Sequence, residues 1–232
     1  MSFWGHLDVL RGTLLRSVIA VAVCFVGCFA AMPYIFEPVI LSAARRFGVE
    51  IININVMTPF LTHMSTSLWA GLIVAFPYLI WELWRFIAPA LYPQEKKSVG
   101  GAMAGVSLLF YAGCAVGYFC VFPLTFKFLA GYQIGEGIES TIALNSYISI
   151  FLSIIFVMGL VFEMPVLAWV LGKLGIIDRK LLKSGRRIAI VALLIIAAVI
   201  TPTGDPFTLM VVFVPLYLLY EISILVIPNG KH

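Results

Sequence analysis

Charge is what this 232-residue chain has least of: only 11% of its residues are Asp, Glu, Lys or Arg. Soluble domains average about 25% charged and roughly 45–50% apolar residues. Here 62% of the residues are hydrophobic and the mean hydropathy is +1.07. These few ionisable side chains would not cover the surface of a soluble protein of this size. The composition therefore predicts a polytopic membrane protein and excludes soluble enzymes, nucleic-acid-binding domains and disulfide-stapled secreted domains.

Signatures of catalysis and of metal binding are also missing. The sequence contains no H-E-x-x-H, no G-x-S-x-G and no G-x-x-x-x-G-K-[ST]. Its three histidines are far apart, and its four cysteines lie in apolar runs without a C-x-x-C, which is typical of small packed side chains. We therefore expect neither enzyme activity nor a cofactor or metal.

Long apolar runs are what the chain does have. A helix needs about 20 apolar residues to cross the roughly 30 Å hydrocarbon core of a bilayer. Six such helices are expected in one all-α membrane domain over residues 1–232, at about residues 15–34, 67–84, 99–123, 146–171, 188–200 and 207–227. The fifth, with 13 residues, would reach only about 20 Å. Pro33 and Pro38 are expected to end the first helix near residue 34. A short interfacial helix is expected within 36–47, and 51–57 is ambiguous.

The basic residues indicate how the chain is oriented. Arg11 and Arg16 before an apolar run would also fit a signal peptide, but the rest of the chain is equally hydrophobic, so an uncleaved first span is the simpler interpretation. Six spans place both termini on one side, together with twelve of the fifteen Lys and Arg residues. The positive-inside rule therefore predicts cytoplasmic termini.

Three carboxylates lie within the apolar segments. Glu163, beside Pro165, would cost at least about 2.5 kcal/mol in hydrocarbon, so it should face the protein interior, a wet cavity or a partner. A proton relay, a partner contact and a structural hydrogen bond all remain open for it. Glu221 lies nearer the cytoplasmic end, where a functional and a structural role are equally open. Glu82 is expected to pair with Arg85 three residues further along the same helix.

Glycines recur at multiples of four residues in the third span. They are Gly101, Gly105, Gly113 and Gly117. Such a face lets another backbone approach closely. We expect packing within the chain rather than a contact between subunits.

Seven segments, in order along almost the whole chain, together resemble one family. They are HLDVLR at 6–11, FIAPALYPQEKK at 86–97, GCAVGYFCVFPLTFKF at 113–128, FEMPV at 162–166, RRIAIV at 186–191, AAVITP at 197–202 and LYEIS at 219–223. The chain resembles TatC, the multispanning subunit of the twin-arginine protein translocase. It departs from the family at Val9, where the family has glutamate and the acid here is Asp8. It also departs at Thr13, usually basic, and at Asp205, which is shifted by one position.

The resemblance implies a concave, glove-like bundle of six helices in a bacterial-type cytoplasmic membrane. It implies a receptor for twin-arginine signal peptides on folded cargo, which assembles with single-span TatA- and TatB-type subunits and draws on the protonmotive force. It places Glu163, Pro165 and Glu221 at a partner site in the membrane, and Pro38 and Asp205 on the periplasmic side. The alternative is a proton-coupled small-solute transporter that uses Glu163 and Glu221 as relays, although the chain shows no internal repeat.

Signal binding is expected at the cytoplasmic carboxylates, since two guanidinium groups favour bidentate pairing with them. Clearly placed acids on that face are Asp8, Glu95 and Asp178, and Asp178 lies among competing bases. Glu95 falls in the segment that best matches the family and is the first candidate. Phe86 is expected to shape its loop, with Asp8 and Arg11 assisting. The alternative is that Glu95 pairs with a neighbouring lysine or with solvent.

Overall fold

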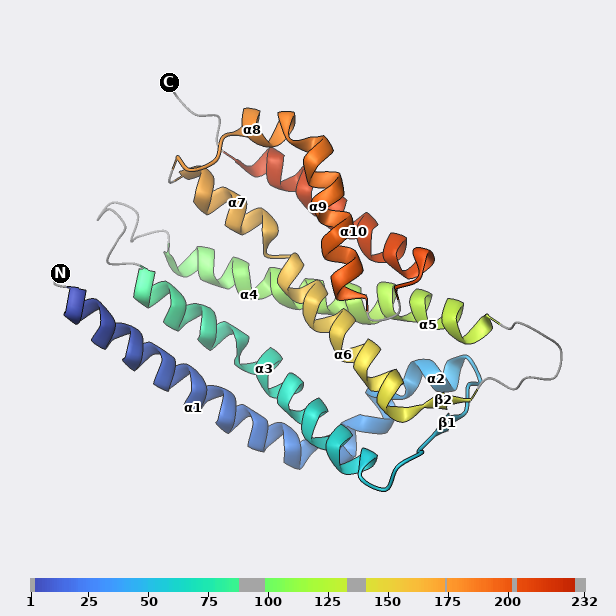
Figure 1. The fold of residues 1–232 in the computed structure, drawn as a ribbon. Coiled ribbons are helices and arrows are strands. Elements are labelled where there is room, and N and C mark those ends of the chain that lie inside the picture. The colour runs from blue at the N-terminus through green and yellow to red at the C-terminus, as the bar shows by residue number, and fades with distance from the viewer. Residues whose placement is uncertain (1–2, 88–98, 133–140, 174, 202–203, 228–232) are drawn as a thin grey trace. The chain divides into compact units, whose positions relative to one another are not determined.

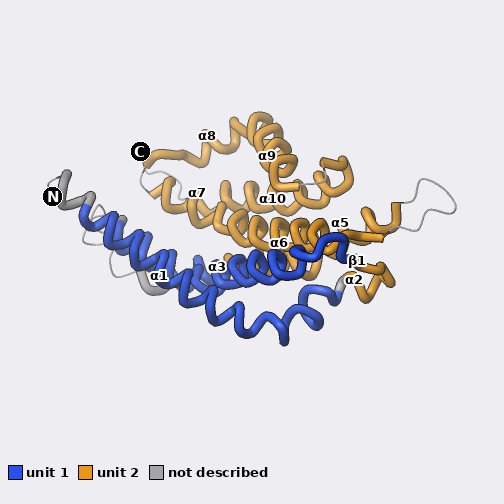
Figure 2. Tube along the Cα trace, turned by 60° about the horizontal axis from the view of Figure 1, so that its bottom comes forward, with its two compact units in different colours: residues 1–42, 53–108 blue, residues 43–52, 109–232 orange. Residues whose placement is uncertain are grey.

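The chain folds almost entirely into helices in the computed structural model (Figure 1). The structure describes residues 3–87, 99–132, 141–173, 175–201 and 204–227. They form two compact units, residues 1–42 with 53–108 and residues 43–52 with 109–232 (Figure 2).

Five helical stretches within the described residues are long and apolar enough to cross a membrane. They are Asp8–Arg46, Thr58–Phe86, Met103–Gly131, Leu144–Lys173 and Pro206–Val226. They correspond to the first, second, third, fourth and sixth expected spans; the first four are longer than expected, and the sixth has the expected length. The fifth expected span is α9 (Arg186–Ile200), whose 15 residues reach about 22 Å. The prediction of an unusually short fifth helix is therefore confirmed.

Unit 1 is built on α1 (Phe3–Ile35) and α3 (Thr58–Ile87), which lie side by side and antiparallel (Figure 1). Gly71 allows this close approach, because a Cβ there would stand 2.7 Å from the backbone nitrogen of Phe25. The unit also contains the π-helical turn η1 (Phe36–Ile40) and the first part of α4 (Val99–Val116).

Pro33 lies inside α1, which ends at Ile35, close to the expected end, and Pro38 lies in the π-helical turn η1 that follows. Proline has no N–H, so the carbonyl of residue 29, four positions earlier, loses its donor within the helix. That carbonyl lies 3.0 Å from Nε2 of His63 on α3, which donates to it in the tautomer protonated at Nε2. The imidazole also stacks on the ring of Phe29, with the centroids 4.1 Å apart. The neighbouring helix thus supplies the missing donor.

Unit 2 contains the remaining elements. They are α2 (Ser42–Arg46), β1 (Ile51–Ile52), the rest of α4, the π-helical turn η4 (Gly117–Val121), α5 (Phe122–Gly131), β2 (Ile142–Ala143), α6 (Leu144–Val161), α7 (Met164–Lys173), α8 (Arg179–Ser184), α9 and α10 (Pro206–Val226). The ambiguous segment after residue 50 begins as a strand, since β1 pairs in parallel with β2. Residues 36–47 form η1 and α2 rather than one short helix.

Small residues bring α4 and α6 together in unit 2. A Cβ on Gly113 would stand 2.5 Å from the carbonyl oxygen of Met158, and one on Gly159 would stand 2.7 Å from the ring of Phe110. Gly117 likewise faces the backbone of α6, at Ile155. The expected packing within the chain is confirmed at Gly113 and Gly117.

The other two glycines of that series differ. A Cβ on Gly105 would meet no atom within 4 Å, so this glycine marks no close contact. The side-chain position of residue 101 lies outside the described residues. Only the second half of the glycine series, Gly113 and Gly117, therefore packs closely against α6 among the described residues.

Candidate functional site

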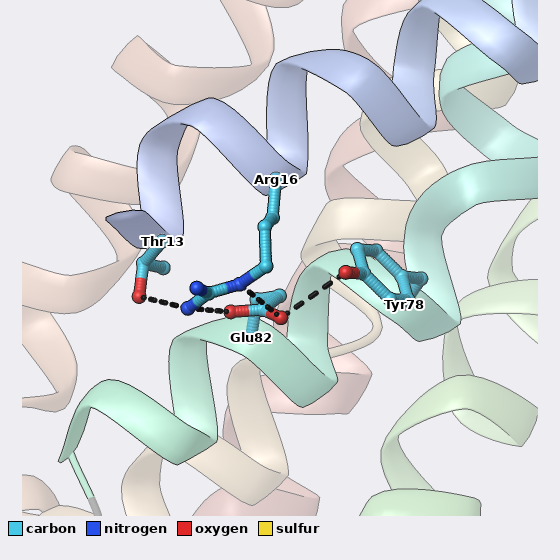
Figure 3. Close-up of polar contacts among 4 residues, drawn as sticks. All are labelled: Thr13, Arg16, Tyr78 and Glu82. Atoms are coloured by element: carbon cyan, nitrogen blue, oxygen red, sulfur yellow. Dashed lines mark hydrogen bonds and ion pairs between the residues drawn. The ribbon is translucent and has the colours of Figure 1, made fainter. Parts of the chain in front are cut away.

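A carboxylate and a guanidinium join the two long helices of unit 1 (Figure 3). Arg16 on α1 donates from Nε to Oε1 and from Nη2 to Oε2 of Glu82 on α3, both at 2.9 Å. The Tyr78 hydroxyl donates to the same Oε1 at 3.1 Å, and Nη2 of Arg16 also donates to Oγ1 of Thr13 at 3.4 Å. The expectation that Glu82 pairs with Arg85 is corrected: its hydrogen-bonded partner is Arg16, 66 residues away.

The carboxylate of this pair is buried, so the pair differs from an ion pair between two exposed side chains. Only 2% of the Glu82 side chain is exposed, against 42% of Arg16. The buried carboxylate has both oxygens hydrogen-bonded, which a charge out of water requires. Removing Arg16 would leave the buried carboxylate of Glu82 without its charged partner, which is destabilising.

The expected signal-binding residues lie at one end of unit 1, so far as they are described. Asp8 and Arg11 are exposed on the early turns of α1, and Phe86 is half-buried in the last turn of α3. The antiparallel arrangement brings the beginning of α1 and the end of α3 to the same end of the unit (Figure 1). Glu95 lies outside the described residues.

Glu163 lies in unit 2, at the break between α6 and α7. It is 7% exposed, and its Oε1 has no hydrogen-bond partner within the described part of the chain. Pro165 follows in the first turn of α7, where a missing N–H does not interrupt the helix. Its burial agrees with the expectation that this carboxyl group faces the protein interior, and within the described residues its unpartnered oxygen distinguishes it from Glu82.

Glu221 joins α10 to α9 in the same unit. Its Oε2 accepts from Nη2 of Arg186 at 2.6 Å, and its Oε1 accepts from the Tyr217 hydroxyl at 3.0 Å. Nearby, the Tyr220 hydroxyl donates to the carbonyl oxygen of Leu182 at 2.6 Å, which ties α10 to α8. Glu221 is therefore paired within the chain, and its partner Arg186, 35 residues earlier, was not evident from the sequence.

Two further expected site residues lie elsewhere. Asp205 is the N-cap of α10, and its Oδ1 accepts from the backbone N–H of Thr208 at 2.7 Å. This hydrogen bond satisfies one of the free N–H groups at the start of the helix. Pro38 lies exposed in η1. Pro38 belongs to unit 1 and Asp205 to unit 2.

Helices of membrane-spanning length, with ionisable groups paired or buried within them, define a multi-pass helical membrane protein. The family model for the Sec-independent protein translocase protein TatC matches residues 5–215. This chain belongs to the TatC family and is a component of a protein translocase.

Relatives match over nearly the whole chain. The TatC protein of Deinococcus radiodurans is 35% identical, over 95% of this chain and 83% of its own length. That of Aquifex aeolicus is 36% identical, over 97% and 93%. A crystal structure of a twin-arginine translocase receptor, TatC, superimposes with a TM-score of 0.85 at 36% identity and covers 95% of this chain and 97% of its own. The all-helical membrane fold agrees with these structures.

Proposed function

We propose that this chain is the receptor and core subunit of a twin-arginine translocase, binding the twin-arginine signal peptides of folded proteins for export. The observation that carries the proposal is the meeting of two family-like segments at one end of unit 1. The segment with Asp8 and Arg11 begins α1, and the segment with Phe86 ends α3. The name of the similar solved structure, a twin-arginine translocase receptor, supports the same function.

The chemistry of recognition follows from charge. A twin-arginine motif presents two planar guanidinium groups, each of which fits a carboxylate bidentately. Glu95 supplies the first carboxylate and Asp8 the second. Phe86 shapes the end of α3, and Arg11 orients the acidic groups beside it. This end of the unit faces the cytoplasm of a bacterial-type cell, where signal peptides arrive, and both termini lie on that side.

The decisive test is Glu95→Gln. The full chain in lipid nanodiscs is titrated with a photoreactive twin-arginine peptide, and a twin-lysine peptide serves as the ligand control. A charged hydrogen bond contributes about 1.5–3 kcal/mol, so we expect crosslinking affinity to fall by about ten- to a hundredfold. Glu50→Gln, which removes an exposed carboxylate from unit 2, should bind as the parent does. Glu95→Gln that binds as tightly as the parent would overturn the assignment.

A partner site in the membrane is the second part of the proposal. Within the described residues the buried Oε1 of Glu163 has no hydrogen-bond partner, and it lies beside a helix break and the buried Pro165. In a lipid environment a polar residue of another transmembrane helix is a favourable partner for such an oxygen. We infer that a single-span subunit of the TatA or TatB type binds here and that transport draws on the protonmotive force.

The short helix α9 contributes to the path of the cargo. Its length of about 22 Å falls short of a hydrocarbon core of roughly 30 Å. A bilayer adapts to a short helix by thinning locally, at a modest cost per Å. Thinning beside α9 would lower the barrier that a folded protein meets.

A further inference from the structure

We propose that Arg16 and Glu82 are positioning residues whose ion pair fixes the axial register of α1 against α3. The register in turn aligns Asp8 and Arg11, early in α1, with Phe86 at the end of α3. The alignment of these residues for signal binding rests on the function proposed above, whereas the register itself does not.

The geometry of the ion pair fixes the position of α1 relative to α3. Both carboxylate oxygens of Glu82 accept from one guanidinium at 2.9 Å, so the contact is bidentate and fixes orientation as well as distance. Tyr78 approaches Oε1 from one turn away on α3, and Thr13 approaches Nη2 from one turn away on α1 (Figure 3). A sliding movement of either helix would break both hydrogen bonds between Arg16 and Glu82, while the contacts of Tyr78 and Thr13, each within its own helix, hold the two side chains in place.

Each member of the pair also belongs to a stripe that leads to the signal-binding end. On α1, Gly12 and Asp8 stand four and eight residues before Arg16. On α3, Phe86 stands four residues after Glu82. These separations correspond to about 12 Å between Arg16 and Asp8 and about 6 Å between Glu82 and Phe86 along the helix axes. Asp8 therefore lies about 6 Å beyond Phe86 along the axis, and a slip of one turn, about 5.4 Å, would either remove this offset or nearly double it.

Three large apolar side chains on the turns around Arg16 contribute little to the register. Leu14, Leu15 and Val18, on the turns around Arg16, are all more than half exposed. In a bilayer such side chains exchange helix contacts for lipid contacts with little change in free energy. The close contacts of Gly71 with Phe25 and of His63 with Phe29 lie further along α1. The ion pair is therefore the specific contact nearest the signal-binding end among the contacts described above.

Gly12 supports the same interpretation. A Cβ at this position would stand 3.3 Å from Nη1 of Arg16, closer than ordinary van der Waals contact. The glycine leaves room for the guanidinium to lie along α1 and reach Glu82.

The experiment measures register and peptide binding separately in the full chain in lipid nanodiscs. Spin labels at Val9→Cys and Leu83→Cys, two exposed positions, report the distance between the helix ends in a background whose four native cysteines are serines. The variants are Arg16→Gln, Glu82→Gln, the double Gln exchange and the swap Arg16→Glu with Glu82→Arg. Arg85→Gln, which removes a neighbouring arginine and leaves the pair intact, is the matched control.

We expect each single variant to broaden or shift the distance distribution and to weaken twin-arginine peptide binding about tenfold or more, the worth of one charged hydrogen bond. The double Gln variant has no unpaired buried charge, so it remains folded while showing a broadened distribution. The swap should restore both the distance and the affinity, and Arg85→Gln should change neither.

Unchanged distances in both single variants and the double Gln variant would overturn the proposal, as would a swap that restores neither readout. A shifted register with parental peptide affinity would overturn the positioning role. A parent chain that does not bind the peptide would instead refute the proposed function, and the distance measurement would still decide the register.

Discussion

Replacing Gly113 with alanine should destabilise unit 2 by an amount that follows from the contact between α4 and α6. The added methyl group would stand 2.5 Å from the carbonyl oxygen of Met158 and 2.8 Å from Cβ of Phe162. The first contact is with backbone, so the two helices must move apart. Overpacking of this kind costs about 1–3 kcal/mol, against about 0.5–1 kcal/mol that alanine gains over glycine within a helix. A net loss of about 1–2 kcal/mol is therefore expected.

The assay measures the apparent melting temperature of the detergent-solubilised chain. Samples are heated to a series of temperatures, and the folded fraction that remains is measured by size-exclusion chromatography. For a chain of this length about 2–4 °C corresponds to each kcal/mol, so Gly113→Ala should melt about 2–8 °C below the parent. Gly105→Ala is the matched control, because it lies on the same helix with no atom within 4 Å of the new Cβ. It should melt at the parental temperature or slightly above. A Gly113→Ala variant as stable as Gly105→Ala would refute the reasoning.

Three further outcomes are expected. Glu163→Ala should reduce co-purification of a single-span partner subunit more than it reduces binding of a twin-arginine peptide, and equal losses would contradict a partner role. Asp205→Ala should lower the free energy of unfolding by about 1 kcal/mol through loss of the helix cap, measured by thermal melting, while Asp205→Asn keeps most of it. Tyr220→Phe removes the hydrogen bond to Leu182 and should speed amide hydrogen exchange in α8, and unchanged exchange would show that this contact does not hold the helix.

Features that depend on one stretch of chain could be predicted from the sequence. The number and approximate place of the spans follow from apolar length alone, because every backbone group in lipid must be satisfied within its own helix. The burial of Glu163 was predictable for a similar reason, since an exposed carboxyl group is costly in lipid whichever residues surround it. The shortness of α9 could be counted directly from the apolar run.

Features that depend on two helices could not be predicted. Residues three apart on a helix are neighbours, so the sequence favours a pair between Glu82 and Arg85. The antiparallel register of α1 instead places Arg16 opposite Glu82. The pairing of Glu221 with Arg186 likewise depends on how α9 returns against α10. Family-like segments indicated where a signal peptide would bind. The contacts that hold those segments in place involve residues outside the motifs.

The proline in α1 has a consequence for how the two helices recognise each other. Inside a bilayer, apolar side chains distinguish poorly between a neighbouring helix and lipid. Pro33 leaves the carbonyl of Phe29 in need of a donor, and His63 on α3 meets that need at 3.0 Å. A helix shifted along its axis, or a different helix without a donor at that height, would leave the carbonyl unsatisfied in hydrocarbon. Pro33 weakens α1 as an isolated helix, and for the same reason it favours packing against a helix that carries a donor at the right height, as α3 does.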